Sequence, residues 1–207
     1  MSASTRLIVM AKAPQAGLSK TRLAPALGPQ GAASLAERFL RETVAMASRS
    51  GVGPVEVCAA PDLEHPVWAR LQREHGCALS VQGTGDLGAR MSRAMQHALG
   101  THAAVLLVGT DAPSLDGDVL RAAARALADA DAVFVPTFDG GYALVGLRRM
   151  EPRLFEGIAW STSGVMEATR RAAQAAGLRH AELPAIHDVD EPADLVHVPP
   201  GWLDAPD

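Results

Sequence analysis

Runs of apolar residues alternate along the chain with segments whose apolar residues recur every three or four positions. The runs predict β-strands, and the three-to-four spacing, as from Leu35 to Phe39 and from Leu40 to Val44, predicts amphipathic helices. We expect strands at 7–10, 55–60, 78–82, 103–108, 132–135, 142–147 and 181–183. We expect helices at 30–50, 65–75, 86–99, 115–128 and 161–177. A serine or threonine should cap the last helix at its start, and Gly177 should close it.

The run Ala103–Val108 is apolar throughout, as in strands buried on both faces of a parallel sheet. Strands that alternate with helices indicate an α/β fold with a mostly parallel central sheet. We expect the 207 residues to form one domain, with 196–207 as a tail. In such sheets ligands bind beyond the carboxyl ends of the strands, where the strand order changes direction. The loops that follow the strands should therefore carry the chemistry.

Composition and charge exclude several classes of function. A net charge of −4 argues against nucleic acid or an anionic membrane as the main partner, because both require a basic surface. The apolar run near the N-terminus is too short for a signal peptide or a membrane span, so we expect a cytoplasmic protein. Cys58 and Cys77 have no metal or disulfide-framework spacing, and we expect both to be buried. The sequence leaves the oligomeric state open, and a homodimer is one alternative.

Both lysines of the chain, Lys12 and Lys20, lie in one stretch that ends the first strand and begins the next loop. All other basic residues except the histidines are arginines. The sequence GLSKT suggests a phosphate-binding P-loop. That motif needs glycine where this chain has Ser19 and Pro14, so it is excluded.

The same loop nevertheless retains the elements of an anion-binding site. Gly17 permits close backbone approach, Lys20 supplies a mobile charge, and Arg22 supplies a two-pronged donor. We therefore expect the loop to bind the phosphates of a nucleotide, through Lys12, Gly17, Lys20, Thr21 and Arg22. The alternative is a solvated surface loop whose charges have no ligand.

Two acidic segments supply candidate ligands for a divalent cation. Asp111 follows a buried strand, where a carboxylate is a usual ligand for an Mg²⁺ that also holds substrate phosphates. Asp188 and Asp190 are two residues apart, so on an extended segment they point the same way, and one of them would complete the pair of ligands. The alternatives are structural, with Asp111 as a turn or cap residue and Asp190 as the N-cap of a helix that starts in Asp190-Glu191-Pro192.

A pair of glycines precedes Tyr142, the single tyrosine of the chain. Gly140 and Gly141 would let backbone amides approach a ligand closely. Asp139, directly before them, is a candidate base facing the acceptor substrate. Asp-Gly between apolar runs also signals a hairpin turn, and both interpretations can hold together.

Two helix N-termini complete the candidate site. Gly85 and Asp86 begin a helix whose amides could meet a base, ribose or phosphate, with Arg90 one turn on. A simple N-cap is the alternative role for Asp86. The start of another helix contributes Trp160, Ser161 and Thr162 as substrate-binding candidates. Trp160 is either a stacking surface or a core residue.

Six segments, taken in order, resemble the bacterial DUF2064 family, the transferase 1 proteins associated with radical-SAM and selenium domains. They are AKAPQAGLSKTRLAP, QGTGDLGARM, VGTDAPSL, DGGYALVGL, AWSTSGV and DVDEPADL. The resemblance extends from about Leu7 to Leu195. It implies a single-domain, Rossmann-type three-layer sandwich of the nucleotide-diphospho-sugar transferase (GT-A-like) superfamily. Relatives include molybdenum cofactor guanylyltransferases and 2-phospho-lactate guanylyltransferase.

The resemblance also implies roles for individual positions. Lys20 and Arg22 match the segment that contacts nucleotide phosphates, and Asp111 matches the metal-binding aspartate. DVDEPADL stands where relatives place a second metal ligand. The implied activity is transfer from a nucleotide-activated donor to a small-molecule acceptor with Mg²⁺ or Mn²⁺, and Asp111, Asp139 and Lys20 are the catalytic candidates. The naming of family members favours glycosyl transfer. Guanylyl or cytidylyl transfer with release of pyrophosphate, and a non-catalytic nucleotide-binding module, are the alternatives.

Overall fold

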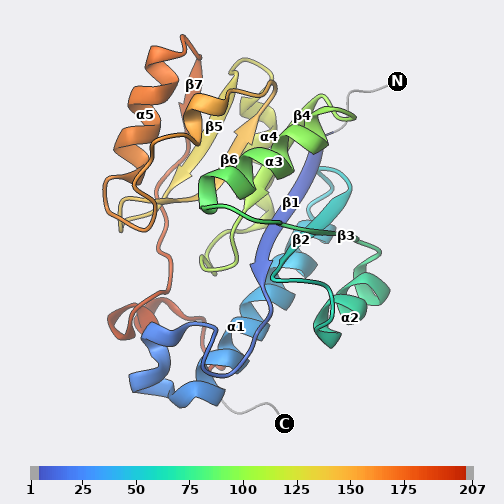
Figure 1. Cartoon of the computed structure of the whole chain (residues 1–207), viewed down its shortest axis with the longest axis vertical. Helices are drawn as coiled ribbons and strands as arrows, with labels where there is room; N and C mark the ends of the chain where they lie inside the picture. Colours follow the sequence, from blue (N-terminus) through green and yellow to red (C-terminus); the bar gives the residue numbers. More distant parts are fainter. Residues whose placement is uncertain (1–4, 204–207) are drawn as a thin grey trace.

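A seven-stranded sheet forms the centre of the molecule (Figure 1). The computed structural model describes residues 5–203. The strands are β1 Thr5–Lys12, β2 Val55–Ala60, β3 Ala78–Val81, β4 Ala104–Val108, β5 Ala132–Pro136, β6 Tyr142–Leu147 and β7 His180–Glu182. The α-helices are α1 Ala24–Arg49, α2 Pro66–His75, α3 Leu87–Leu99, α4 Gly117–Ala126 and α5 Val165–Ala175. Short 3-10 helices are η1 Thr21–Leu23, η2 Pro152–Leu154 and η3 Pro192–His197.

The strand order is β3-β2-β1-β4-β6-β5-β7. Neighbouring strands are parallel except where β6 pairs antiparallel with β4 and β5. The predicted α/β fold with a mostly parallel sheet is therefore confirmed. Every predicted strand is present, with its ends displaced by no more than two residues.

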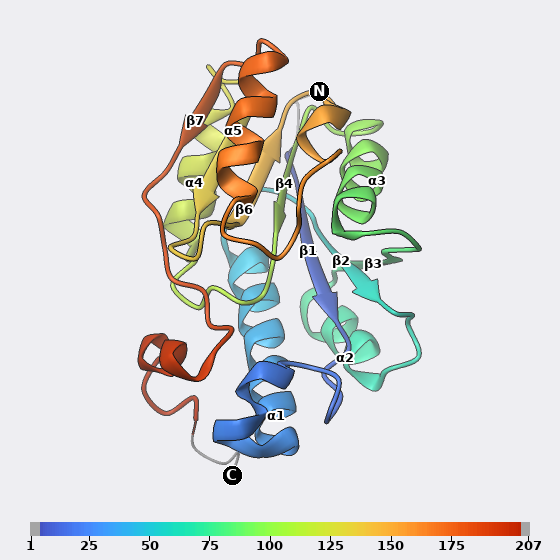
Figure 2. The same ribbon diagram turned by 60° about the vertical axis from the view of Figure 1, so that its left-hand side comes forward.

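Helices cover both faces of this sheet (Figures 1 and 2). In β1, Leu7 and Val9 belong to the core cluster that includes residues of α1, α2 and α4. Ile8 and Met10 belong to the cluster on the other face, with residues of α3 and α5. Because alternate residues of a strand point to opposite faces, an unbroken apolar run fills both cores at once. The result is the expected three-layer arrangement.

The strand order changes direction at β1. The chain places β2 and β3 on one side of β1 and then crosses to place β4 on the other side. Because β6 runs antiparallel to its neighbours, the turn 137–141 lies at the same edge as the loops that follow β1 and β4. Ligand sites of open α/β sheets lie at such a point. The fold thus brings three of the sequence-predicted segments to one edge.

Helix α1 begins earlier than the expected start at residue 30. Its first turn, 24–27, is separated from the remainder by Gly28, whose φ of 71° and ψ of 164° are not helical, and by Pro29. The prediction therefore located the part of the helix beyond this kink.

The predicted start of the last helix, with a serine or threonine cap, is wrong. α5 begins at Val165, its N-cap is Gly164, and no side chain caps it. Ser161 has a left-handed φ of 63°, which the helix cannot include, so residues before Gly164 form a turn. Gly177, with a φ of 64°, follows the helix end as expected.

A separate apolar cluster, which we call the satellite core, joins the start of α1 to the segment that follows β7 (Figure 2). Its buried members are Leu23, Ala32, Leu35, Phe39, Val189 and Val198. Trp202 packs against Phe39, with ring centroids 5.9 Å apart. The described part of the expected tail, 196–203, therefore lies against α1, and residues 204–207 lie outside the described part.

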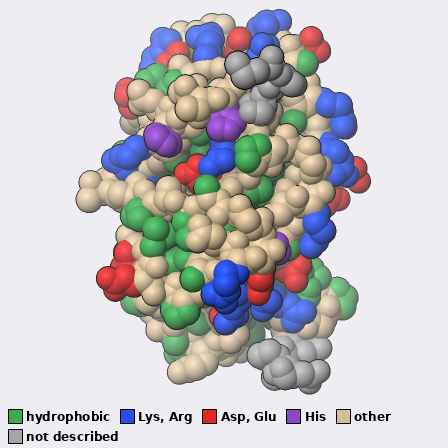
Figure 3. Space-filling view, turned by 90° about the vertical axis from the view of Figure 1, so that its right-hand side faces the viewer, with side chains coloured by type: hydrophobic (Ala, Val, Ile, Leu, Met, Phe, Trp, Pro, Cys, Tyr) green, Lys and Arg blue, Asp and Glu red, His purple; other side chains and the backbone are tan. Residues whose placement is uncertain are grey.

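Among the helices of residues 5–203, none combines the length and the hydropathy that crossing a bilayer requires. On the face seen in Figure 3, Lys and Arg side chains are interspersed with Asp and Glu side chains. This mixture gives that face no single dominant sign of charge.

Candidate functional site

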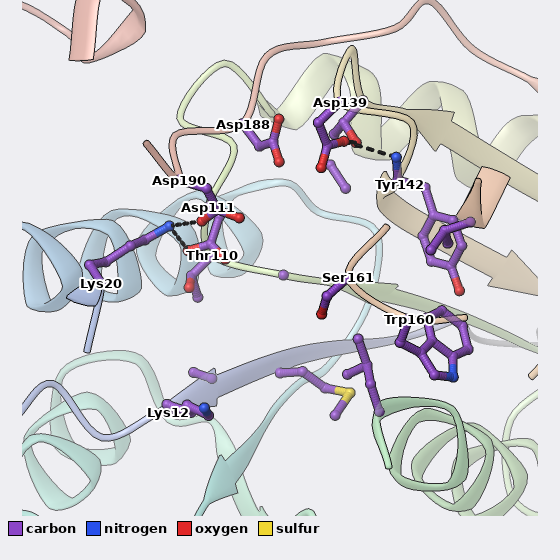
Figure 4. A pocket seen from close by; sticks show the side chains of 18 of the residues that line it. Lys12, Lys20, Thr110, Asp111, Asp139, Tyr142, Trp160, Ser161, Asp188 and Asp190 are labelled. Carbon is purple, nitrogen blue, oxygen red and sulfur yellow. Dashed lines mark hydrogen bonds and ion pairs between the residues drawn. The ribbon is translucent and has the colours of Figure 1, made fainter. Parts of the chain in front are cut away.

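A cavity of about 740 Å³ opens at the edge of the sheet where the strand order changes direction. Its walls come from the ends of β1 and β4, the turn between β5 and β6, the first turn of α3 and the segment before η3. The volume lies within the range typical of small-molecule sites. Figure 4 shows charged side chains around Lys20 on one side of the cavity and the rings of Tyr142 and Trp160 on the other.

Lys20 lies between two carboxylates at the charged side of the cavity (Figure 4). Its Nζ is 2.5 Å from Asp111 Oδ1 and 2.7 Å from Asp190 Oδ1. The same nitrogen donates to the backbone carbonyl of Val189 at 2.6 Å. The Lys20 side chain is 8% exposed, whereas those of Asp111 and Asp190 are 47% and 43% exposed. The cation is therefore enclosed, and the carboxylates remain open to solvent and ligand.

The environment of Lys20 keeps its amine protonated. Burial lowers the pKa of the Lys20 ammonium, but Asp111 and Asp190 outweigh that effect and raise the pKa above its usual value. The Phe39 ring centroid lies 5.5 Å from Nζ, a cation–π contact. Lys20 is therefore a permanent positive charge at neutral pH.

The backbone at Lys20 is strained. Its φ of 48° and ψ of 42° are left-handed, a conformation that is uncommon for residues with a side chain. The preceding loop is closed by Ser19, whose Oγ donates to the Ala13 carbonyl at 2.8 Å and accepts from the Gln15 amide at 3.0 Å. Within the described residues, Lys20 and Ser161 are the non-glycine positions with positive φ, and both line the cavity. Strained residues of this kind gather at functional sites.

The satellite core holds the two arms of this ion-pair cluster together. Leu23, three residues after Lys20, is fully buried there beside Val189, the neighbour of Asp190. The Val189 amide also donates to the carbonyl of Asp111 at 2.8 Å. Segments distant in sequence thus converge because apolar burial and one backbone hydrogen bond fix them.

Two further carboxylates lie above this cluster in Figure 4. Thr137 Oγ1 and the Gly141 amide donate to Oδ1 of Asp139, at 2.5 Å and 2.8 Å. The pKa of Asp188 is raised to about 6, first by burial and then by the negative charge of Asp139. This part of the cavity is therefore rich in negative charge.

Asp111 and Asp190 fit the chemistry of a magnesium site. Their Oδ1 atoms already converge on one position, which a positive charge, the Lys20 ammonium, occupies. Mg²⁺ is usually held by one or two carboxylates together with substrate phosphates and water. Within residues 5–203, no group of three or more His, Cys, Asp or Glu side chains is arranged to hold a metal ion. A divalent ion here would therefore take part of its coordination from a ligand.

The other side of the cavity is aromatic and apolar. The rings of Tyr142 and Trp160 meet edge to face with centroids 6.4 Å apart, and Leu87 and Met91 of α3 adjoin the cavity as well. Burial raises the pKa of the Tyr142 hydroxyl, which donates to Met91 Sδ at 3.9 Å. Gly88 is required beneath the indole, since a Cβ there would lie 2.6 Å from Trp160 Nε1.

Gln82, at the end of β3, is a cavity residue that the sequence analysis did not single out. Its side chain is buried, and Nε2 donates to the carbonyls of Ala11 and Cys58 at 3.1 Å and 3.0 Å. Arg90 donates to Gln82 Oε1 at 3.0 Å, so the amide orients the guanidinium in the cavity wall. A polar residue directly after a short strand is the signal that could have revealed it.

Most of the residues predicted from the sequence line this one cavity. These are Lys12, Lys20, Thr21, Arg22, Arg90, Asp111, Asp139, Gly141, Tyr142, Trp160, Ser161, Thr162, Asp188 and Asp190. Trp160 thus borders the cavity while also packing on α3.

Four predicted residues do not line the cavity, namely Gly17, Gly85, Asp86 and Gly140. Asp86 caps α3 by accepting from the Ala89 amide at 2.8 Å, so the N-cap alternative is confirmed. Gly17 and Gly85 have φ values of 79° and 102°, which turn the chain outside the cavity. Gly140 packs so closely on the carbonyl of Ser163 that a Cβ would clash. These four residues lie in the turns and the helix start that border the cavity.

The capping alternative for Asp190 is wrong. Glu191 is the N-cap of η3, and the Asp190 side chain is bound to Lys20. Arg22 lies at the rim, 63% exposed and 3.8 Å from Glu191. Exposed pairs of this kind contribute little, so a ligand at the rim can compete for Arg22.

Comparison with known proteins relates the chain to one family. Residues 43–162 match the model of a family described as uncharacterized proteins conserved in bacteria (DUF2064). A protein from Desulfovibrio desulfuricans, described as a candidate nucleotide-diphospho-sugar transferase, is 31% identical in sequence. That match covers 94% of this chain and 85% of the other, with a TM-score of 0.86. A comparison with curated proteins gives no match.

More distant solved structures share the fold. A 4-diphosphocytidyl-2C-methyl-D-erythritol synthase from Anaerococcus prevotii is 9% identical, covers 93% of this chain and 95% of its own, and has a TM-score of 0.63. A nucleotidyl transferase from Methanothermobacter is 14% identical, with coverages of 97% and 98% and a TM-score of 0.61. These similarities extend over nearly the whole chain, as expected for one domain of this fold class.

Proposed function

The chain belongs to the DUF2064 family, and on this premise we propose that its cavity binds a nucleotide-activated donor and transfers a group from it to a small-molecule acceptor. The observation that carries the proposal is the convergence of Lys20, Asp111 and Asp190 at the mouth of a cavity of about 740 Å³. Cationic and anionic groups at one rim are what a diphosphate and its divalent ion require.

Lys20 and Arg22 would bind the phosphates. Lys20 is held in place by its buried stem and its strained backbone, and phosphate oxygens offer its ammonium an alternative to the two carboxylates. Arg22, at the exposed rim, can present two donors to the same group. Charge neutralisation by fixed groups stabilises a phosphate leaving group without a protein nucleophile.

Asp111 and Asp190 would hold Mg²⁺ or Mn²⁺, which supplies further neutralisation of the leaving phosphates when bound. The acceptor would lie towards Asp139. Because Thr137 and Gly141 fix Oδ1 of Asp139, its Oδ2 is available to take the proton from an acceptor hydroxyl. In glycosyl transfer, the acceptor oxygen forms the new bond to the sugar carbon while that carbon loses the nucleoside diphosphate.

Two observations support glycosyl transfer. The relative that is 31% identical is described as a candidate nucleotide-diphospho-sugar transferase. In the loop after β1, the amides of Gln15, Leu18 and Ser19 are bonded within the loop itself. A triphosphate would need many such donors, whereas Lys20 and Arg22 match a diphosphate.

Nucleotidyl transfer is the second candidate. The distant fold relatives include a nucleotidyl transferase and a diphosphocytidyl-methylerythritol synthase. In that reaction the acceptor oxygen would attack the α-phosphorus of a nucleoside triphosphate and pyrophosphate would leave.

The two reactions are separated by their products. The purified protein is incubated with Mg²⁺, a cell extract as acceptor, and panels of nucleotide sugars and nucleoside triphosphates. Acceptor-dependent release of nucleoside diphosphate supports glycosyl transfer, and release of pyrophosphate supports nucleotidyl transfer. Nucleotide binding without turnover of any donor would contradict both and favour a binding module.

Asp111→Asn is the decisive variant in this assay. It should abolish Mg²⁺-dependent nucleotide binding and turnover while the protein stays folded. The matched control is Asp118→Asn in α4, where the side chain is 87% exposed and outside the cavity lining. Equal behaviour of the two variants would contradict the role of Asp111.

A further inference from the structure

The start of α3 lines the cavity with side chains of two kinds. Arg90 donates to Gln82 Oε1 at 3.0 Å, and we call these two residues the polar compartment. Met91, the next residue, accepts a hydrogen bond from the Tyr142 hydroxyl through its Sδ at 3.9 Å. Leu87 and Trp160 also line the cavity. We call Leu87, Met91, Tyr142 and Trp160 the apolar compartment.

The apolar compartment lies away from the cations of the cavity. Figure 4 shows Tyr142 and Trp160 at the opposite end from Lys20. Lys12, a second lysine of the lining, also lies away from the two rings in Figure 4. Of the two arginines in the lining, Arg22 is next to Glu191, and Arg90 is hydrogen-bonded to Gln82. The charged side chain closest in sequence to Tyr142 is acidic, Asp139. A negative group placed between the two rings and Asp139 would have no lysine beside it and would approach a carboxylate.

We propose that this apolar compartment receives the body of the acceptor, and that the acceptor is an uncharged molecule with an aromatic or aliphatic body and a hydroxyl directed to Asp139. The inference rests on the proposed transferase function and deepens it by naming the acceptor class. Phosphorylated and carboxylated acceptors are excluded by the same geometry.

The polar compartment suits the nucleobase of the donor. Gln82 Oε1 and the Asp86 carbonyl orient the Arg90 guanidinium, whose Nη2 protons can donate to a base edge. The aromatic side offers ring faces, but the Tyr142 hydroxyl is buried against sulfur and Trp160 Nε1 faces Gly88. The donor and acceptor can therefore occupy the cavity together, with the phosphates between them and Lys20.

The test compares two probes with the same biphenyl body, the neutral alcohol biphenylmethanol and the anion biphenylcarboxylate, by isothermal titration calorimetry with the whole chain. The neutral probe should bind at least about tenfold more tightly, because a buried unpaired carboxylate loses more than 1.4 kcal/mol on desolvation. Equal affinities, tighter binding of the carboxylate, or no binding of the neutral probe would each overturn the proposal.

A variant that introduces a positive charge localises the effect. Leu87 is half-buried at the cavity wall, so Leu87→Lys can be accommodated with its amine at the compartment. It should shift the ratio of the two affinities about tenfold towards the carboxylate. The matched control is Gln96→Lys, on the same helix but exposed and outside the cavity lining. An equal shift in both variants would overturn the placement.

Competition separates this inference from the transferase proposal. Nucleoside diphosphates (uridine, cytidine, guanosine and adenosine) are titrated in the absence and presence of saturating biphenylmethanol. Simultaneous binding supports the two compartments, whereas mutual exclusion would place the base in the aromatic compartment and overturn the inference. Nucleotide binding that depends on Lys20 would survive either result, so the function proposal is decided separately, by that binding and by donor turnover.

Discussion

Replacing Lys20 by methionine removes one charge and keeps most of the buried hydrocarbon. The methionine can retain the contact with Phe39 while the two carboxylates lose their shared ammonium. Lys12→Met is the matched control, because Lys12 lies in the same cavity lining but is exposed. The pair of variants therefore compares an enclosed ammonium with a solvated one.

The expected magnitude follows from the contacts of Lys20. Its Nζ makes two ion pairs, at 2.5 Å and 2.7 Å, and a carbonyl hydrogen bond at 2.6 Å. Hydrogen bonds to charged groups contribute about 1.5–3 kcal/mol each in buried settings. Because the carboxylates are 47% and 43% exposed, water screens most of this energy. We expect Lys20→Met to reduce the free energy of unfolding by about 2 kcal/mol, or Tm by about 4–8 °C.

Thermal unfolding with and without Mg²⁺ measures two effects of Lys20→Met on Tm that have opposite signs. Without Mg²⁺, Lys20→Met should unfold at a lower temperature than Lys12→Met. With Mg²⁺, the Lys20→Met variant should gain more in Tm than the wild type, since the ion no longer competes with an ammonium between Asp111 and Asp190. Nucleoside diphosphate affinity should fall more in Lys20→Met than in Lys12→Met.

Three results would refute this reasoning. Equal Tm values for the two lysine variants would show that the enclosed ion pairs contribute nothing measurable. An equal Mg²⁺ effect on wild type and Lys20→Met would show that the ion does not bind between these carboxylates. Equal nucleotide affinities would show that Lys20 is not the phosphate-binding lysine.

The remaining predictions concern stability. Asp188→Asn should raise Tm at about pH 8 but not at about pH 4. The pKa of Asp188 is about 6 in the folded protein and 3.8 ordinarily, so above about pH 6 the ionised carboxylate reduces the free energy of unfolding by about 1–2 kcal/mol after screening. An equal gain in Tm at both pH values would contradict this. Gly88→Ala should cost about 1–3 kcal/mol in chemical denaturation, because its Cβ would clash with the Phe155 carbonyl oxygen and with the Trp160 indole. Gly164→Ala, whose Cβ meets only an ordinary contact, is the control and should not. Trp202→Ala should lower the free energy of unfolding by about 1–2 kcal/mol, because its packing on α1 is lost. An unchanged urea-unfolding midpoint would show that this contact does not stabilise the protein.

The strands could be predicted from sequence because local patterns determine them. Val55–Ala60 and Tyr142–Leu147 were located to the residue, since each apolar run is bounded by glycine, proline or polar residues. Helix α5 was misplaced at its start because Ser161 adopts a left-handed φ that no local pattern announces. The break at Gly28 has a local signal in Gly28-Pro29, and the predicted helix begins directly after it. The helical turn 24–27 before the break has no apolar spacing that predicts it, and it follows Leu23, which is buried in the satellite core.

The candidate site was likewise only partly predictable from the sequence. Lys20, Asp111 and Asp190 were recognisable as chemistry-bearing residues, but the ion pair between Lys20 and Asp190 spans 170 positions and has no local signature. The sequence also could not show that Lys20 itself occupies the position between the carboxylates. Gln82 was missed because a lone polar residue after a strand resembles a surface residue until its buried partners are known.

The satellite core determines when the site can form during synthesis. Synthesis delivers Lys20 and Asp111 long before Val189 and Asp190, and Leu23 has no apolar partner from the far segment until Val189 emerges. A nascent chain can pair its early strands while this cluster is still open. Competence for ligand would then appear late and abruptly, when residues 189–198 close over the start of α1, so a partly translated chain would not sequester nucleotide on the ribosome.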